Sequence, residues 1–231
     1  EPLSGKRHPP HHVAPTEDTH TPAGMVGARW GAVLVAAVTA GSLPAGGLGQ
    51  DANNVATVDS CTARVEQTGT FTDDTGTGYT RFRLYVEVPD AALTNVYALY
   101  GTAEHPLIVP PAYQVASPFG ADFGGVNPAL FAASPTAEYD SWLTIGLDDG
   151  DPRSLLAKSP GFIFDPADER GWNATKGMRK QDAAIFYMDP DQGPTDRSVL
   201  VAQLTCRTPL AGHFGATVNV RGRGTLAAEP A

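Results

Sequence analysis

The sequence carries a short acidic turn at residues 148–151, Asp-Asp-Gly-Asp, directly after the apolar run 142–147. Calcium prefers carboxylate and carbonyl oxygens, and glycine permits the bend that would bring Asp148, Asp149 and Asp151 around one ion. The spacing differs from that of an EF-hand loop. Acids and glycine are also typical of plain turns, in which Asp side chains accept hydrogen bonds from nearby backbone. The turn therefore predicts a calcium site, with ordinary turn chemistry as the alternative.

Paired carboxylates recur elsewhere in the chain. A glycoside hydrolase needs two carboxyl groups that face a sugar across roughly 5–10 Å, so these pairs keep glycoside hydrolysis open as an enzymatic alternative. The sequence does not show which pairs face one another. The pairs are Glu138 with Asp140, Asp148 with Asp149 and Asp151, Asp165 with Asp168, and Asp189 with Asp191.

Stronger catalytic signatures are absent from the sequence. It contains no Gly-x-Ser-x-Gly elbow, phosphate-binding loop, His-Glu-x-x-His or Cys-x-x-Cys motif. Four of the six histidines fall within residues 1–24, which leaves His105 and His213 for the rest of the chain. The sequence therefore favours a non-catalytic protein.

Three aromatic residues are candidates for ligand binding, because flat rings pack well against the apolar faces of sugars. Trp172 lies in a polar stretch and is expected to be exposed, whereas Trp142 lies within a strand-like run and is expected in the core. Tyr113 and Phe119 belong to the connection 105–138, which is rich in proline, glycine and aromatic residues. Long irregular connections are often functional, although these rings could equally cover a face of the sheet.

The triplet Asn173-Ala174-Thr175 next to Trp172 is an acceptor sequence for N-glycosylation. It predicts that Asn173 lies at the surface of an exported glycoprotein. Such triplets also arise by chance, so the prediction depends on export.

The two cysteines, Cys61 and Cys206, are expected to form a disulfide. Each lies in a strand-like run and shares a face with apolar residues, and early and late strands of a sandwich often lie close together. Export would favour the bridge because extracellular compartments are oxidising. Two buried free thiols are the alternative.

The elements that must position these residues read as strands. Residues 79–88 alternate between apolar and polar side chains, which is typical of a half-buried strand in an antiparallel sheet. Residues 68–78 are expected to form a hairpin-like loop, 154–158 a helical turn, and 95–100 a strand next to 79–88 in a meander. The sequence predicts an all-β, antiparallel two-layer sandwich with long Pro/Gly-rich loops and about eight short strands: 57–66, 79–88, 95–100, 142–147, 161–164, 183–188, 198–206 and 214–221.

The composition agrees with this fold and limits the partners. The chain has 231 residues, 25 glycines, 20 prolines and a formal net charge of −9. The glycines and prolines indicate many turns. The negative charge argues against nucleic acid and anionic membranes as partners.

The N-terminal region differs from the rest and predicts export. Residues 1–24 are expected to be disordered or an upstream extension, and residues 25–49 a signal peptide or signal anchor with cleavage near 47–50. The apolar run 30–43 is shorter than the about 20 residues that a membrane span requires, so no span is expected in the mature chain. Residues 50–224 then form one β-sandwich domain, and 225–231 a disordered tail.

Four segments resemble a β-sandwich module of secreted, often multi-copy surface proteins of algae and marine bacteria. They are Pro-Pro-Ala-Tyr-Gln at 110–114, Pro-Phe-Gly-Ala-Asp-Phe-Gly-Gly-Val-Asn-Pro at 118–128, Glu-Tyr-Asp-Ser-Trp-Leu-Thr-Ile-Gly at 138–146 and Val-Leu-Val-Ala-Gln-Leu-Thr at 199–205. The resemblance covers about residues 58–222 and brings no catalytic residue. It therefore implies a binding or structural role.

These observations together predict a secreted or cell-surface, non-catalytic module of a surface, cell wall or extracellular matrix. The expected partners are a polysaccharide or other matrix proteins. A carbohydrate-binding module is the first alternative and a glycoside hydrolase the second. Calcium is the one cofactor that the sequence suggests.

Overall fold

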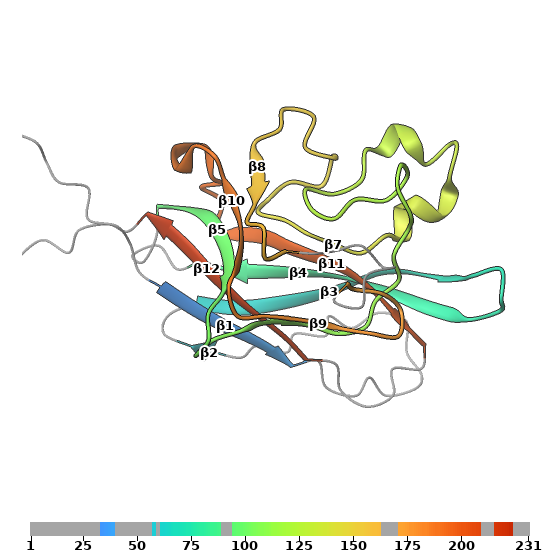
Figure 1. Cartoon of the computed structure of the whole chain (residues 1–231), viewed down its shortest axis with the longest axis horizontal. Coiled ribbons are helices and arrows are strands. Elements are labelled where there is room, and N and C mark those ends of the chain that lie inside the picture. Colours follow the sequence, from blue (N-terminus) through green and yellow to red (C-terminus); the bar gives the residue numbers. More distant parts are fainter. Residues whose placement is uncertain are drawn as a thin grey trace, which may run out of the picture.

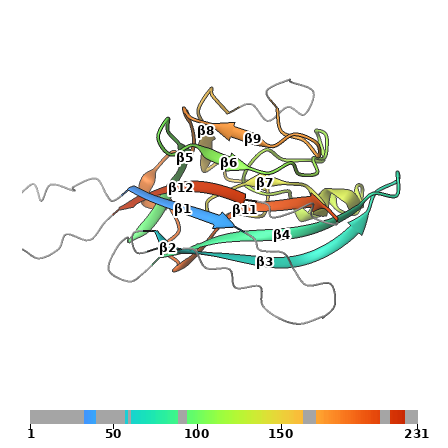
Figure 2. The ribbon, with the colours of Figure 1, turned by 90° about the horizontal axis from the view of Figure 1, so that it is seen from below.

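The computed structural model describes residues 33–39, 57–58, 61–88, 94–162, 171–208 and 215–223. These residues form two antiparallel β-sheets packed face to face (Figures 1 and 2). The predicted all-β sandwich is confirmed, with more strands than the expected eight. The predicted tails 1–24 and 225–231 lie outside the described residues.

One sheet has five strands. Its long central members pair over most of their length, with β4 between β3 and β11. In order across the sheet the strands are β2 (Thr57–Val58), β3 (Cys61–Thr72), β4 (Gly78–Glu87), β11 (Ser198–Arg207) and β7 (Trp142–Leu143).

The other sheet has seven strands. Six follow one another across the sheet, and β1 (Val33–Thr39) pairs with β12 beside this path. Short 3₁₀ turns η1 (Pro128–Leu130), η2 (Pro135–Tyr139) and η3 (Pro190–Gln192) lie in the connections. The six strands are β8 (Leu156–Lys158), β10 (Ala183–Tyr187), β5 (Asn95–Gly101), β12 (Gly215–Arg223), β6 (Leu107–Val109) and β9 (Met178–Lys180).

The alternation of β4 decides which side chains enter the core. Phe82, Leu84, Val86 and Val88 are buried between the sheets, whereas the residues between them are partly exposed. This confirms the predicted strand. Burial of each such side chain contributes about 1.5–3 kcal/mol, so the four together stabilise the sandwich substantially.

The hairpin between β3 and β4 is tighter than the sequence suggests. Residues 68–72, expected in a loop, continue β3, and only 73–77 turn. The Oδ1 atom of Asp73 accepts hydrogen bonds from the backbone N–H groups of Thr75 and Thr77 at 3.0 and 2.9 Å. Because the Asp73 side chain binds these backbone N–H groups, it stabilises a short turn between β3 and β4.

Several expectations about strand order are wrong. Strand β5 does not extend a meander from β4, because it joins the other sheet between β10 and β12. Within the expected strand 142–147 only Trp142 and Leu143 pair as β7, which is the last strand at one edge of the five-stranded sheet. The expected helical turn at 154–158 is replaced by β8, which pairs with β10. Of the expected strand 161–164, Gly161 lies in a turn and Phe162 in no strand, and residues 163–164 lie outside the described residues.

The long connection 110–141 folds over the outer face of the five-stranded sheet. A second hydrophobic cluster lies there, in which Trp142 of β7 and Leu200 of β11 are buried with Val126 and Ala137 of the connection. Trp142 is 2% exposed, which confirms that it is a core residue. The connection therefore covers the outer side of the edge strand β7, and both residues of this strand are buried.

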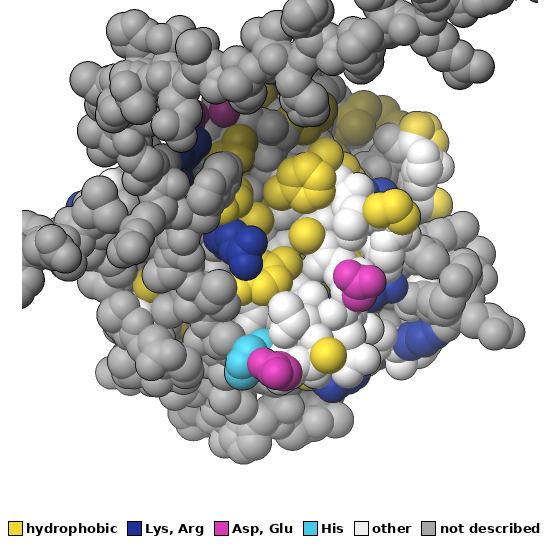
Figure 3. Space-filling model, turned by 60° about the vertical axis from the view of Figure 1, so that its left-hand side comes forward, with side chains coloured by type: hydrophobic (Ala, Val, Ile, Leu, Met, Phe, Trp, Pro, Cys, Tyr) yellow, Lys and Arg dark blue, Asp and Glu magenta, His cyan; other side chains and the backbone are white. Residues whose placement is uncertain are grey.

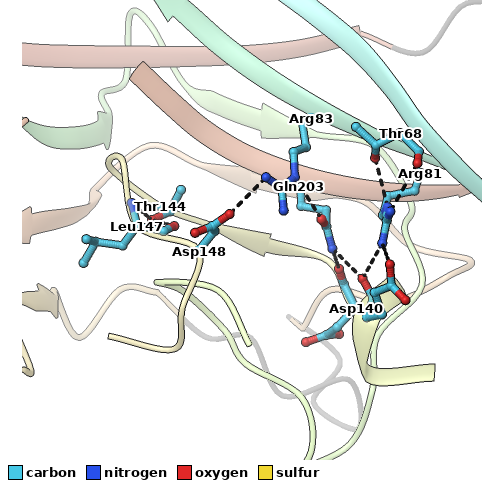
Figure 4. Close-up of polar contacts among 9 residues, drawn as sticks. Thr68, Arg81, Arg83, Asp140, Thr144, Leu147, Asp148 and Gln203 are labelled. Carbon is cyan, nitrogen blue, oxygen red and sulfur yellow. Dashed lines mark hydrogen bonds and ion pairs between the residues drawn. The ribbon is translucent and has the colours of Figure 1, made fainter. Parts of the chain in front are cut away.

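Polar side chains of the sheet bind the same connection (Figure 4). Arg81 of β4 donates to the backbone oxygen of Glu138 at 3.1 Å and to its Oε1 at 2.8 Å. The amide nitrogen of Gln203, on β11, donates to the backbone oxygens of Glu138 and Asp140 at 3.0 and 2.8 Å. Arg81 and Gln203 thus fix the start of the segment that becomes β7.

Asp140 closes the base of the turn 116–120. Its Oδ1 accepts from the N–H of Val115 at 2.8 Å and its Oδ2 from the N–H of Ala121 at 2.7 Å. The side chain is fully buried. Burial raises the pKa of the Asp140 carboxyl to about 7, although the hydrogen bonds from backbone N–H groups oppose the rise.

The predicted signal segment 25–49 is described only at 33–39, where the backbone forms strand β1. Within the described residues, no helix combines the length and the apolar character needed to cross a membrane.

Candidate functional site

A groove of about 520 Å³ lies over β5, β10 and β12 of the seven-stranded sheet. This is the face of the sheet that turns away from the hydrophobic core. Figure 3 looks toward the left-hand side of Figure 1, where these strands are labelled; there hydrophobic side chains gather in a patch with a basic side chain among them.

The register of the three strands brings the groove side chains together. Ala98 of β5 pairs with Phe186 of β10 on one side and with Arg221 of β12 on the other. Tyr100, two residues further along β5, pairs with Ala184 of β10. Because side chains alternate along a strand, all five share the outer face. The residues between them are buried in the core: Leu99, Ile185 and Val220.

The hollow exists because small side chains lie between large ones. Ala98 and Ala184 have side chains of one methyl group, so they fill little space above β5 and β10. The larger side chains of Tyr100, Phe186 and Arg221 lie next to them and form the walls of the groove. Larger residues at the two alanine positions would fill this space. The groove is thus a direct result of which residues the strand pairing places side by side.

Arg221 is the only cation and Asp182 the only acid among the described residues that line the groove. The guanidinium carbon of Arg221 lies 5.4 Å from the centre of the Tyr100 ring, within the range of a cation–π contact. Burial raises the pKa of the Tyr100 hydroxyl, and the charge of Arg221 opposes the rise. The oxygen of this hydroxyl is buried beside the side chain of Arg221, so a ligand in the groove would contact both groups.

The rim of the groove combines apolar and polar groups. Met188 at the end of β10 is 72% exposed, which is unusual for so large an apolar side chain. Thr102 and Ser159 add hydroxyl groups. A mostly apolar floor with a few polar groups at its edge is typical of sites for small organic ligands and sugar units.

One feature of the sequence could have indicated this groove. Strands β5 and β10 each carry an alanine two residues from an aromatic side chain, Ala98 with Tyr100 and Ala184 with Phe186. Which aromatic residue lies beside which alanine depends on strand pairing. The sequence predicts that β5 lies beside β4, whereas it lies between β10 and β12.

Trp172 is not the exposed side chain that the sequence predicts. It is 0% exposed, and its Nε1 donates to the backbone oxygen of Pro110 at 2.7 Å. The backbone N–H of Ala112 donates to the oxygen of Asn173 at 3.0 Å, so the two loops are joined on either side of the ring. The expectation of an exposed platform is therefore wrong, because tertiary contacts cover a ring that lies in a polar stretch.

Tyr113 and Phe119 also lie away from the groove. Tyr113 packs edge-on against Phe71 at 4.9 Å between ring centres and lies 5.1 Å from the ring of Tyr79. Phe119 packs against the second hydrophobic cluster, next to Trp142 and its neighbours. Both rings are half-buried and take part in fixing the connection to the sheet.

The three acids of the predicted calcium site bind separate partners. Asp148 pairs with Arg83 at 3.0 Å, and Asp149 accepts from the N–H of Asp151 at 3.2 Å. Asp151 accepts from the N–H groups of Leu155 and Leu156, both at 2.8 Å. In the part of the chain that the structure describes, no three acidic, histidine or cysteine side chains form a group that could hold a metal. Calcium at this turn stays a prediction.

The paired carboxylates do not meet in the groove. Glu138 pairs with Arg81, and Asp140 is enclosed by backbone N–H groups. Asp189 accepts from the N–H of Asp191 at the start of η3. The pair Asp165 and Asp168 lies outside the described residues.

Asn173 of the predicted glycosylation triplet is half-buried in a turn. Its Oδ1 accepts hydrogen bonds from the N–H groups of Thr175 and Lys176 at 2.9 and 3.0 Å, and from the hydroxyl of Thr175 at 2.8 Å. Its carbonyl group thus organises the turn. A glycan on Asn173 stays a prediction.

The predicted disulfide between Cys61 and Cys206 is wrong, because both thiols are free and buried. Strands β3 and β11 run antiparallel to β4 on its two sides. Thr62, next to Cys61, pairs with Glu87, whereas Cys206 pairs with Thr80 at the other end of β4. More than seven residues of strand, at least about 23 Å, therefore separate the two cysteines along β4, far beyond the reach of a disulfide.

Native protein is therefore expected to react with a thiol reagent at neither cysteine, and unfolded, unreduced protein at both. Burial raises the pKa of the Cys206 thiol to about 12 and also raises that of Cys61, so reactive thiolate is scarce in the folded state. Titration with a chromogenic disulfide in buffer and in guanidinium chloride measures this. An absence of titratable thiol after unfolding would restore the disulfide.

Comparison with protein-family models, with curated proteins and with solved structures found no match for this chain. The class of protein is therefore defined by its own geometry: an all-β sandwich with an aromatic groove on the outer face of one sheet.

Proposed function

We propose that this chain is a non-catalytic extracellular module that binds a polysaccharide in the groove over β5, β10 and β12. The observation that carries the proposal is the combination of Tyr100 and Phe186 with Arg221 around a floor of alanines. Pyranose rings have apolar C–H faces and polar edges. The aromatic side chains suit the faces, and the guanidinium group suits hydroxyl or carboxylate oxygens at the edges.

The groove supports binding in preference to hydrolysis. Hydrolysis of a glycosidic bond requires two carboxyl groups around the sugar, and Asp182 is the only acid among the described residues that line the groove. The extracellular setting rests on the signal peptide predicted at residues 25–49 and on the resemblance to secreted surface modules.

Filling the groove tests the proposal. The Ala184→Trp variant should bind polysaccharide at least 10-fold more weakly than the unmodified chain, because the indole would occupy the hollow between Tyr100 and Phe186. Ala184 is half-exposed on the outer face, so the melting temperature should change little. Binding is measured by co-sedimentation with cellulose and chitin and by affinity electrophoresis in xylan and alginate.

The matched control is Ala133→Trp, which adds the same side chain at an exposed position after η1, in the connection over the other sheet. It should bind as the unmodified chain does. Equal binding by both variants would remove the groove as the site. No binding of the unmodified chain to any of the four polysaccharides would favour a purely structural module of a matrix.

A further inference from the structure

The positive charge of Arg221 is not balanced by a carboxylate of any residue that the structure describes. Its guanidinium group lies against the ring of Tyr100 instead, and the side chain is exposed at the groove. Four other arginines on the strands each pair with an aspartate or glutamate within 3.2 Å: Arg64, Arg81, Arg83 and Arg223. Arg221 therefore offers an unpaired cation to whatever enters the groove.

The contact with Tyr100 prepares this cation for a ligand. It restricts a long side chain, so less conformational entropy is lost when the ligand binds. The planar guanidinium group carries five N–H donors, which is more than the Tyr100 hydroxyl can accept. Two of these donors match the two oxygens of a carboxylate in parallel hydrogen bonds.

The strand register places an apolar wall opposite the cation. Phe186, Ala98 and Arg221 form one row across β10, β5 and β12. Neighbouring strands lie about 4.8 Å apart, so about 10 Å separates the Cα atoms of Phe186 and Arg221, with the small side chain of Ala98 between them. A sugar ring above Ala98 would pack against Phe186 and direct a substituent of its opposite edge toward Arg221.

We propose that the groove binds acidic polysaccharides, whose sugar rings carry a carboxylate, and that Arg221 binds this carboxylate. The inference rests on the polysaccharide binding proposed above and adds the class of sugar. Hydrogen bonds between a guanidinium group and a carboxylate are about twice as strong as those between neutral groups. Acidic sugars are therefore preferred over neutral sugars of the same ring and linkage.

The acid in the groove lies too far from Arg221 to cancel this preference. Asp182 directly precedes Ala183, which pairs with Gly101 of β5. Arg221 pairs with Ala98, three residues earlier on β5. Asp182 and Arg221 are thus about 16 Å apart, about twice the distance over which physiological salt screens exposed charges. The net charge of −9 acts mainly on the approach of a charged polymer, whereas nearby groups decide the contact in the groove.

Two matched pairs of ligands test the inference. They are oligosaccharides of alginate and of polygalacturonate, each compared with its carboxyl-reduced form, in which neutral hydroxymethyl groups replace the carboxylates. For at least one pair, the unmodified chain should bind the acidic form about 10-fold more tightly at about 0.15 M salt. Arg221→Gln should bring the two affinities within about twofold, because it removes the charge. Isothermal titration calorimetry measures the affinities, and melting curves check that the variant is folded.

The matched control is Arg207→Gln, which removes the same charge at an exposed position at the end of β11 in the other sheet. It should keep the preference of the unmodified chain. Equal affinities for acidic and reduced forms, or a preference that folded Arg221→Gln retains, would overturn the inference and leave polysaccharide binding in place. Absence of binding to both acidic ligands would also overturn it, and the proposed function would fail as well only if cellulose, chitin and xylan were not bound either.

Discussion

Replacement of Asp140 by alanine is expected to lower the free energy of unfolding by about 2–3 kcal/mol at pH 5. The variant removes the group that accepts hydrogen bonds from the N–H groups of Val115 and Ala121. Because the Asp140 side chain is fully buried, the two donors would then lose their acceptor in the interior of the protein. The turn 116–120 would lose the contact that joins its two ends. Chemical denaturation at pH 5 measures the loss.

The loss should become smaller as the pH rises, because of how the Asp140 carboxyl titrates. Its pKa is about 7 in the folded chain and near 3.9 when exposed in the unfolded chain. Between these values the folded state keeps a proton that the unfolded state has released. The stability contributed by Asp140 is thus fully present below about pH 4 and is lost as the pH rises through 7, by up to about 1.4 kcal/mol per pH unit.

The matched control is Asp74→Asn, which changes an exposed acid in the β3–β4 turn. It should leave the free energy of unfolding and its pH dependence nearly unchanged. The comparison of unmodified and variant chains between pH 4 and 8 isolates Asp140 from the other acids. A loss for Asp140→Ala that grows with pH would contradict the raised pKa.

Replacement of Trp172 by alanine should cost about 3–5 kcal/mol and lower the melting temperature by about 10 °C or more. The ring is fully buried, and its N–H group satisfies the backbone oxygen of Pro110. The variant would leave both a cavity and an unpaired carbonyl group. Calorimetric or fluorescence-detected melting measures the effect.

Trp172→Phe is the informative partner variant, because it keeps most of the buried ring and removes only the N–H donor. Its loss should be about 1–2 kcal/mol. If Trp172 were instead an exposed sugar platform, Trp172→Ala would weaken polysaccharide binding and leave the melting temperature unchanged. That result would contradict the buried position.

Local side-chain patterns were sufficient for much of the fold. The alternation along 79–88 predicts the inward residues Phe82, Leu84, Val86 and Val88 correctly, because a strand has a period of two whatever its partners are. The burial of Trp142 follows from its apolar neighbours in the same way. Turn residues around these runs then predict an all-β chain.

Contacts between distant segments were beyond such patterns. Cys61 and Cys206 both face the core, as their neighbours suggest, yet β3 and β11 lie on opposite sides of β4 and place them at its two ends. Trp172 lies in a polar stretch, and only the packing of its loop against Pro110 buries it. A residue's own neighbours do not report the strand order or the loop contacts.

By itself, the sequence determined that the chain forms antiparallel strands and which side chains of residues 79–88 face the core. Only the tertiary structure decided the groove, because Ala98 and Ala184 lie beside Phe186, Tyr100 and Arg221 through the pairing of β5 with β10 and β12. It likewise placed residues 33–39 on the edge of β12. The physical reason is that periodicity depends on covalent geometry along one strand, whereas a binding surface depends on which strands become neighbours.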